Sequence, residues 1–333
     1  MQPRVLRANL IRHLREQHLF DATDHVLVAV SGGQDSLRLL RWLTAGDLPI
    51  DLQPQVSAIY INHQLRSDAQ QEEELVRKVF AHTPHLQSAT IRKLDWSEVP
   101  TVSVEEKARE KRYGVMFSVA EQVGANSIVT AHHRNDQVET ILYKLARGSR
   151  LEQLTGMPEK QTLTNGLKLV RPFLSLSKLE LKDLIKEPVQ EWIDDYTNDD
   201  QQYARNRLRN AVIPDLQHIN KQAVAHIIDF ADQLTALQAL ANPQIKQYVA
   251  ALEAGVLDWE LPAEQLLLVL QQWLQKQEVF DVKDRQLRQT IQLMRNQNVA
   301  TGSIQLNDYK QLIRDHQWLR LVKSQNFFSS FSY

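Results

Sequence analysis

Short apolar runs alternate with longer amphipathic stretches over the first two-thirds of the chain. Valine and isoleucine are frequent in the short runs, as in buried β-strands, while apolar residues recur at helical spacing in the longer stretches. Repeated strand–helix units of this kind predict an open parallel α/β sheet with helices on both faces. The expected strands are residues 25–30, 56–61, 88–94 and 127–131, and the expected helices are residues 1–18, 36–44, 69–81, 103–123 and 134–146.

The pattern changes beyond about residue 214. Helical periodicity dominates residues 217–297, as the spacing of Leu266, Leu270 and Leu274 illustrates. Two short runs, at residues 302–306 and 318–322, then predict the strands of a C-terminal hairpin. We therefore expect an α/β domain at residues 1–216 and a smaller, mainly helical domain at residues 217–333.

Composition narrows the classes of protein that fit. Hydrophobic residues make up 43% and charged residues 24% of the chain, which is ordinary for a soluble globular protein. No apolar run approaches the roughly 20 residues of a membrane span, and the charged N-terminus does not fit a secretory signal, so we expect a cytoplasmic protein. The absence of cysteine excludes disulfides and a catalytic thiol. With a net charge of −1, any nucleic-acid surface must be a local basic patch.

One loop between a predicted strand and the next helix carries candidate chemistry. Adjacent glycines allow a tight turn and a close approach to a ligand, and the helix N-terminus offers N–H groups to phosphate. Asp35 would repel phosphate by itself, so a bound Mg²⁺ is its natural partner. The alternative is an exposed turn with an aspartate cap, which the full six-residue string makes less favoured. The predicted ATP-binding loop consists of Ser31, Gly32, Gly33, Gln34, Asp35 and Ser36.

This string resembles the pyrophosphatase loop, or PP-loop, of the N-type ATP pyrophosphatases. These enzymes split ATP between its α- and β-phosphates and attach AMP to an oxygen of the substrate. The resemblance implies a sheet of the adenine-nucleotide alpha-hydrolase type. The loop alone does not choose among the amide synthetases, nucleotide synthetases and tRNA-modifying enzymes that share it.

Further strings choose among these families. In their order and spacing they resemble tRNA(Ile)-lysidine synthetase, over about residues 25–214 and more weakly beyond. The chain is similar to a short form that lacks the second C-terminal domain of some relatives, and its residues 217–333 would then bind tRNA. The strings are NHQLR at 62–66, AREKRY at 108–113, AHHRNDQVET at 131–140, RGS at 147–149, RPF at 171–173, residues 195–198, and RNRLR at 205–209.

The resemblance implies a defined reaction. The enzyme would adenylate O2 of the wobble cytidine in the CAU anticodon of tRNA(Ile), and free lysine would then displace AMP at C2. The product, lysidine, switches codon reading from AUG to AUA and charging from methionine to isoleucine. ATP with Mg²⁺, lysine and the tRNA are the implied partners; a homodimer is compatible with the sequence, which does not fix the oligomeric state.

Two other classes of protein remain as alternatives. Another PP-loop enzyme could adenylate a tRNA or form an amide on a small molecule, although tRNA thiolases generally use cysteine and amidotransferases need a glutaminase nucleophile. A non-catalytic nucleotide-binding module of the universal-stress type would share the architecture. Such a module would have no need for Asp35, Asp136 and Glu139 together.

The predicted helix at 134–146 carries two candidate carboxylates. Asp136 and Glu139 are three residues apart, with His132 just before them, so they project near the carboxyl edge of the sheet. We predict that Asp136 and Glu139 are catalytic and bind the lysine ammonium, with Asp136 also near the metal. The alternative is a solvated helix face. His132 is predicted to contact nucleotide rather than to form a zinc site with His133.

The basic candidates are less sharply defined. Arg109 and Arg112 share a helix face, and we favour Arg112 as a catalytic cation at the α-phosphate over a surface face paired with glutamates. His63 and Arg66 follow a strand end, and His63 is predicted to bind ATP. The cluster at 205–209 predicts contacts with tRNA phosphate, and the resemblance implies that one of its arginines could reach lysine instead. We favour Arg205 and Arg207 for these contacts, without deciding which of Arg205, Arg207 and Arg209 contacts which group.

Overall fold

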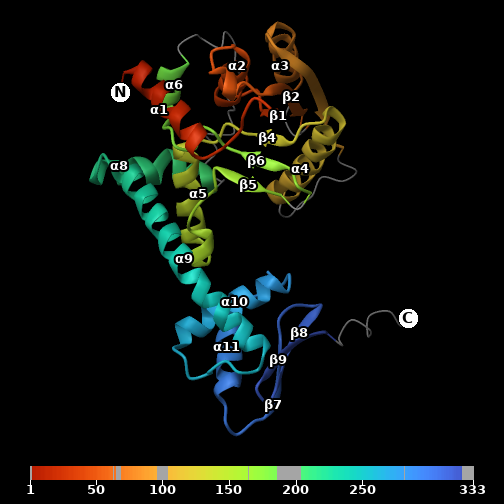
Figure 1. Ribbon diagram of the computed structural model, residues 1–333, viewed down its shortest axis with the longest axis vertical. Helices are drawn as coiled ribbons and strands as arrows, with labels where there is room; N and C mark the ends of the chain where they lie inside the picture. The colour runs from red at the N-terminus through yellow and green to blue at the C-terminus, as the bar shows by residue number, and fades with distance from the viewer. Residues whose placement is uncertain are drawn as a thin grey trace. The chain divides into compact units, whose positions relative to one another are not determined.

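The chain folds into two compact units, Met1–Leu234 and Thr235–Tyr333 (Figure 1). A computed structural model describes residues 2–62, 64, 69–95, 104–163, 165–185, 204–280 and 282–324. The division between the units lies inside helix α9 (Ala223–Glu253), later in the chain than the boundary at residue 216 that the change of pattern suggested.

A six-stranded sheet with strand order β3-β2-β1-β4-β6-β5 forms the centre of the first unit. All neighbouring strands are parallel except β5, which pairs antiparallel with β6 at the edge. The predicted open parallel sheet is therefore confirmed, with an antiparallel edge strand added. The strands are β1 (His25–Val30), β2 (Gln55–Asn62), β3 (Leu86–Lys93), β4 (Ser127–Val129), β5 (Lys160–Thr162) and β6 (Lys168–Val170).

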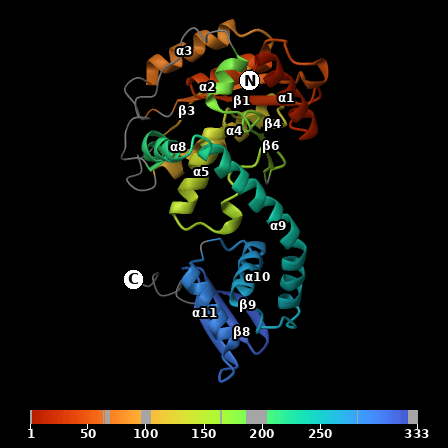
Figure 2. The same cartoon turned by 90° about the vertical axis from the view of Figure 1, so that its left-hand side faces the viewer.

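Helices cover both faces of this sheet, as Figures 1 and 2 show. Successive residues of β1 point to opposite faces, because side chains alternate along a strand. Val26 and Val28 join one apolar cluster with helices α1, α2 and α3, whereas Leu27 joins another with α4. These helices and the next one are α1 (Pro3–Glu16), α2 (Gln34–Thr44), α3 (Ala69–His82), α4 (Val104–Val123) and α5 (Arg134–Ala146).

The carboxyl ends of the parallel strands meet at one edge of the sheet. Ser31 follows β1, Asn62 ends β2, Thr130 follows β4 and Arg171 follows β6. Ligands bind at this edge in open α/β folds. Smaller elements complete the surroundings: 3₁₀ turns η1 (Ile50–Leu52) and η2 (Leu151–Gln153), and helix α6 (Lys178–Leu184).

A helical run with a widened turn packs against α5. It comprises α7 (Ala204–Arg207), the π-helical segment η4 (Leu208–Val212) and α8 (Ile213–Ile219). Pro214 has no N–H to donate to the carbonyl of residue 210, which disfavours regular α-helix at this point. Single π-helical turns of this kind are frequent at functional sites.

The second unit has an apolar core of its own. Helices α10 (Ala263–Lys276) and α11 (Asp284–Arg295) pack with a three-stranded antiparallel sheet of order β7-β8-β9. The two strands expected from sequence are β7 (Thr301–Gln305) and β9 (Trp318–Lys323), and both pair with an additional strand between them, β8 (Lys310–Asp315). None of the described helices combines the length and the apolarity needed to cross a membrane.

Candidate active site

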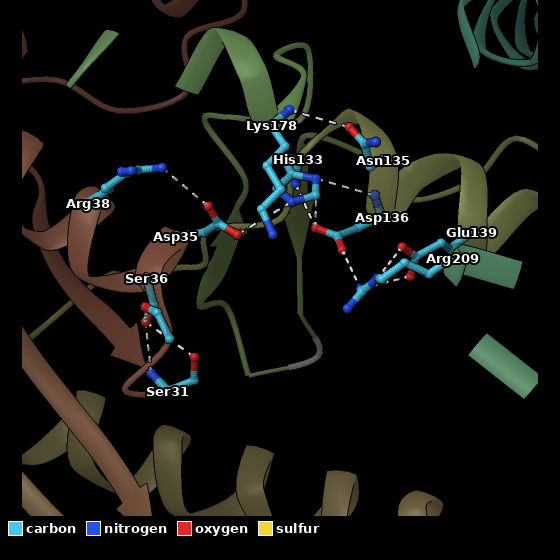
Figure 3. A network of polar contacts seen from close by, with 11 residues as sticks. Ser31, Asp35, Ser36, Arg38, His133, Asn135, Asp136, Glu139, Lys178 and Arg209 are labelled. Atoms are coloured by element: carbon cyan, nitrogen blue, oxygen red, sulfur yellow. Dashed lines mark hydrogen bonds and ion pairs between the residues drawn. The ribbon is translucent and has the colours of Figure 1, made fainter. Parts of the chain in front are cut away.

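The loop after β1 turns tightly into α2. Gly32 has φ 74°, in the left-handed region that favours glycine, and Gly33 caps the helix. A Cβ at Gly32 would lie 2.5 Å from the Glu72 carboxylate, so the loop packs closely on α3. The Ser31 N–H donates to Ser36 Oγ at 3.1 Å, and Ser36 Oγ donates to the Gly33 carbonyl at 2.9 Å (Figure 3).

The loop lines a cavity of about 470 Å³ at the carboxyl edge of the sheet. Residues from nine elements or their ends reach this cavity, which brings together most of the described residues that the sequence singled out. Polar side chains in its wall include Ser31, Gln34, Asp35, Ser36, Asn62, Glu72, Arg112, His132, Asp136, Lys178 and Arg209.

His133 connects the loop to α5 (Figure 3). Its Nε2 lies 3.5 Å from Asp35 Oδ2, and its Nδ1 accepts a 3.4 Å hydrogen bond from the Asp136 N–H. The His133 N–H donates in return to Asp136 Oδ2 at 2.9 Å, which completes a capping box at the start of the helix. The imidazole is buried, with 5% of the residue exposed. It therefore fixes Asp35 and Asp136 relative to each other.

The charges of this network support one another. Burial raises the pKa of the Asp35 carboxyl, but His133, Lys178 and Arg38 outweigh burial and hold the pKa below its ordinary value. Burial lowers the pKa of His133, yet Asp35 and Asp136 outweigh it and leave the pKa raised. Asp35 is consequently ionised at neutral pH.

The donor set around Asp35 fits the implied Mg²⁺. Asp35 Oδ1 is buried and accepts no hydrogen bond, and it faces Arg38 Nη1 only at 4.0 Å. Mg²⁺ prefers oxygen ligands and usually takes one or two carboxylates together with substrate phosphates and water. Within the described ranges no group of three or more His, Asp or Glu side chains is arranged to hold a metal. An ion at Asp35 would therefore depend on phosphate oxygens for most of its coordination.

Asp136 and Glu139 lie on one face of α5, with a guanidinium against them (Figure 3). Arg209 Nε and Nη2 donate to the two Glu139 oxygens at 2.7 and 2.9 Å, and Nη2 lies 3.4 Å from Asp136 Oδ1. Burial raises the pKa of Glu139, and Arg209 offsets part of this effect. The site thus presents two carboxylates that already hold one cation.

The three arginines of the 205–209 string have different surroundings. Arg209 contacts both carboxylates, although the sequence had favoured Arg205 and Arg207 for contacts with lysine or tRNA. Arg205 lies over the Tyr143 ring, 5.8 Å from its centroid, and Arg207 is an exposed residue at the end of α7. Arg205 and Arg209 are four residues apart and both contact side chains of α5, as residues on one helix face would.

His132 is a neutral group in the cavity wall. Its Nδ1 is 2.8 Å from Thr130 Oγ1. Burial lowers its pKa to about 4, and Arg171, Arg112 and Arg109 act in the same direction against Asp136. His132 and His133 face different partners, as expected for adjacent histidines at a strand-to-helix turn.

Arg112 places a guanidinium with an unsatisfied hydrogen-bond donor in the cavity wall. Its buried Nε has no hydrogen-bond partner, and burial together with Arg109 and Arg205 lowers its pKa. Among the described residues it forms no ion pair with a carboxylate.

Some of the residues singled out from the sequence lie outside the described residues. They are His63, Arg66 and residues 195–198. The side chains of Glu105 and Glu106, the alternative surface partners of Arg109 and Arg112, are also outside them.

Comparison of the sequence with known proteins shows the family to which this chain belongs. A model described as PP-loop domain matches residues 6–216. A protein of Lactiplantibacillus plantarum named tRNA(Ile)-lysidine synthase is 33% identical over 312 residues, which cover 91% of this chain and 68% of the relative. The chain belongs to the tRNA(Ile)-lysidine synthase family. A relative of the same name from Nostoc sp. is 33% identical over 301 residues, with 86% of this chain and 83% of the relative covered.

Solved structures support the fold of this lysidine synthase family member. The U34-tRNA thiolase of Methanococcus maripaludis, solved with its [4Fe-4S] cluster, superposes with a TM-score of 0.54 at 14% identity. The match covers 70% of this chain and 79% of the thiolase. Similarity at this level extends to the fold alone, and it supports the mostly parallel α/β sheet described above.

Two functional candidates of this lysidine synthase family member escaped the sequence analysis. His133 was set aside with the idea of a metal pair, although its position before a helix with an acid three residues later is a capping signal. Arg171 directly follows β6 at the ligand edge, a position that the sequence did not reveal because β6 is too short to show a strand pattern. The position of each residue relative to a helix start or a strand end identifies it, whereas its residue type alone does not.

Proposed function

We propose that this chain forms lysidine at the wobble cytidine of tRNA(Ile) bearing a CAU anticodon, with ATP, Mg²⁺ and free lysine. The observation that carries the proposal is the match over nine-tenths of the chain to relatives of that name. The cavity supports it, because loop 31–36 and Asp136 face the same space, and Arg209 in the cavity wall joins Asp136 to Glu139.

The first step would activate the base. With the ATP phosphates against loop 31–36, O2 of the cytidine attacks the α-phosphorus, a P–O bond to the base forms, and pyrophosphate leaves as the bond to the β-phosphate oxygen breaks. Mg²⁺ held by Asp35 would neutralise charge on the phosphates. Arg112, with its unsatisfied Nε in the cavity wall, would stabilise charge on the α-phosphate.

The second step would transfer lysine. Asp136 and Glu139 bind the side-chain ammonium in the place that the Arg209 guanidinium holds in this structure. The amine must lose a proton before it attacks C2, and Glu139 is suited to accept one because burial raises its pKa. A C–N bond then forms at C2 and AMP leaves with the O2 oxygen.

Nucleotide products test this proposal. Incubation with Mg²⁺-ATP, lysine and the CAU tRNA should release AMP and pyrophosphate in equal amounts, and only when the tRNA is present. Asp35→Asn should reduce the rate by at least about a hundredfold, since one group that stabilises transition-state charge contributes roughly that much. Asp47→Asn, an exposed carboxylate just beyond α2, is the matched control and should keep full activity.

Release of ADP and phosphate instead of AMP and pyrophosphate would refute the proposal. Release of AMP and pyrophosphate without attachment of lysine would favour the alternative, another adenylating enzyme of the PP-loop family.

A further inference from the structure

Five cations gather beside the cavity, on three helices and at the end of one strand. Three of them lie against tyrosine rings: Arg109 and Arg112 are 5.3 and 5.8 Å from the centroid of Tyr113, and Arg205 is 5.8 Å from that of Tyr143. We call this group the basic cluster; it consists of Arg109 and Arg112 of α4, Lys144 of α5, Arg171 after β6, and Arg205 of α7.

The polar atoms of the cluster are incompletely satisfied. Arg171 is only 3% exposed, and its Nη1 donates to the Pro158 carbonyl at 2.6 Å, while its Nε is buried without a partner. Arg112 Nε is in the same condition. Lys144 Nζ reaches only the Gly156 carbonyl, at 3.4 Å. Such buried donors cost free energy unless a ligand satisfies them.

Like charges crowd the cluster. Burial lowers the pKa of Lys144, and Arg109, Arg205 and Arg171 lower it further. In the part of the chain that the structure describes, none of the five cations forms an ion pair with a carboxylate. Arg209, by contrast, is paired with Glu139. In a chain of net charge −1, such a cluster is the local basic patch that a nucleic-acid ligand requires.

We propose that the four members of the basic cluster outside the ATP cavity, Arg109, Lys144, Arg171 and Arg205, bind a backbone phosphodiester of the tRNA beside the target cytidine. The cavity that holds the ATP loop includes Arg112 but none of the other four cations, so they are placed to take an anion other than the nucleotide phosphates. Lys144 lies eight residues beyond Asp136 on α5, which is about 12 Å along the helix axis.

This inference rests on the proposed function for the identity of its RNA, but it is tested separately. Arg109→Gln and Lys144→Gln each remove one charge at positions that do not touch the ATP loop. Each should weaken binding of the CAU tRNA by about tenfold, as expected for a hydrogen bond to a charged group, and reduce the salt dependence of binding by about one phosphate contact. The affinity for Mg²⁺-ATP, measured by calorimetry without RNA, should not change.

The matched control is Lys78→Gln on α3, an exposed lysine on the other face of the sheet, which should keep wild-type tRNA affinity. The thermal unfolding midpoint distinguishes ligand binding from a structural role. If Lys144 stabilised the fold, Lys144→Gln would lower the midpoint. Because Lys144 is repelled by its neighbours, Lys144→Gln should unfold at the same or a higher temperature than the wild type.

Three results would overturn the inference. One is a loss of ATP affinity with tRNA affinity intact, which would make the nucleotide the ligand. Another is unchanged affinity for both ligands, and the third is a lower thermal midpoint, which would make the cluster part of the folding core. Failure of lysidine formation by the wild type, with tRNA binding still sensitive to these two substitutions, would refute the proposed function and leave the phosphate site standing.

Discussion

At the scale of single residues, Glu139 has the most specific task. It is 4% exposed and holds Arg209 through two hydrogen bonds, so a buried carboxylate of the site can bind a cation that reaches it from the cavity. Glu139→Gln removes the charge and keeps the shape. We expect the KM for lysine to rise by roughly tenfold or more, since hydrogen bonds between charged groups contribute about 1.5–3 kcal/mol. The KM for ATP should change little.

Steady-state lysidine formation with either substrate varied measures both constants. Glu121→Gln, an exposed glutamate on α4, provides the control, and thermal unfolding verifies that the variants remain folded. An unchanged lysine KM in Glu139→Gln would remove Glu139 from the lysine site.

His132 makes a prediction about pH and stability. Its pKa of about 4 in the fold lies below the ordinary value of 6.5, so the unfolded chain binds a proton between these limits that the folded chain does not. The free energy of unfolding should therefore fall as pH drops from about 6.5 to 4, by up to about 3 kcal/mol from this group. His132→Asn should lose less stability over that window.

Denaturant unfolding of both proteins at several pH values measures this difference. His133 acts in the opposite direction, because its pKa is raised, but it is present in both proteins and its contribution cancels. Parallel curves for the wild type and His132→Asn would contradict the buried, neutral state of the imidazole.

At the scale of elements, the turn from β1 into α2 places different demands on two adjacent glycines. Gly32 has a positive φ and no room for a Cβ beside Glu72, whereas a Cβ at Gly33 would meet only Ser31 Oγ, at 3.5 Å. Gly32→Ala should lower the free energy of unfolding by about 1–2 kcal/mol from the left-handed conformation alone, before the clash adds to it. Gly33→Ala is the matched control, with a smaller loss expected by chemical denaturation; equal losses would contradict the turn geometry.

The elements also show what the sequence could and could not reveal. Periodicity predicted β1 and α5 at their observed bounds, because long buried patterns leave few alternatives. It missed β5 and β6, which have only three residues each and too few side chains to show alternation. It also missed β8, whose mixed sequence KQLIRD buries Leu312 and Arg314 against the second unit's core.

Some features of the candidate site could be predicted from the sequence, and others could not. Residues that follow strand ends, such as Asp35 and Asp136, could be predicted because topology brings those ends together. The pairing of Arg209 with Glu139 and the approach of His133 to Asp35 each join two segments that are far apart in the sequence. Neither property is a feature of local sequence.

At the scale of the whole molecule, the two units have separate apolar cores. Leu274 is fully buried in the core of the second unit, and Leu14 is fully buried in that of the first. Leu274→Ala should destabilise its own unit by about 2–5 kcal/mol and leave the first unit's melting transition in place. Leu14→Ala should do the reverse. Calorimetry measures both, and a single transition that shifts in both variants would show that the units unfold together.

Mass analysis of the modified nucleoside tests the central claim most directly. The protein is incubated with Mg²⁺-ATP, lysine labelled with a heavy isotope and a tRNA(Ile) transcript with a CAU anticodon, and the digested nucleosides are then weighed. We predict one cytidine that has gained a labelled lysine with loss of water, and none in a matched transcript with uridine at the wobble position. Unmodified cytidine in the CAU transcript, with a known lysidine synthase active in parallel, would contradict the account.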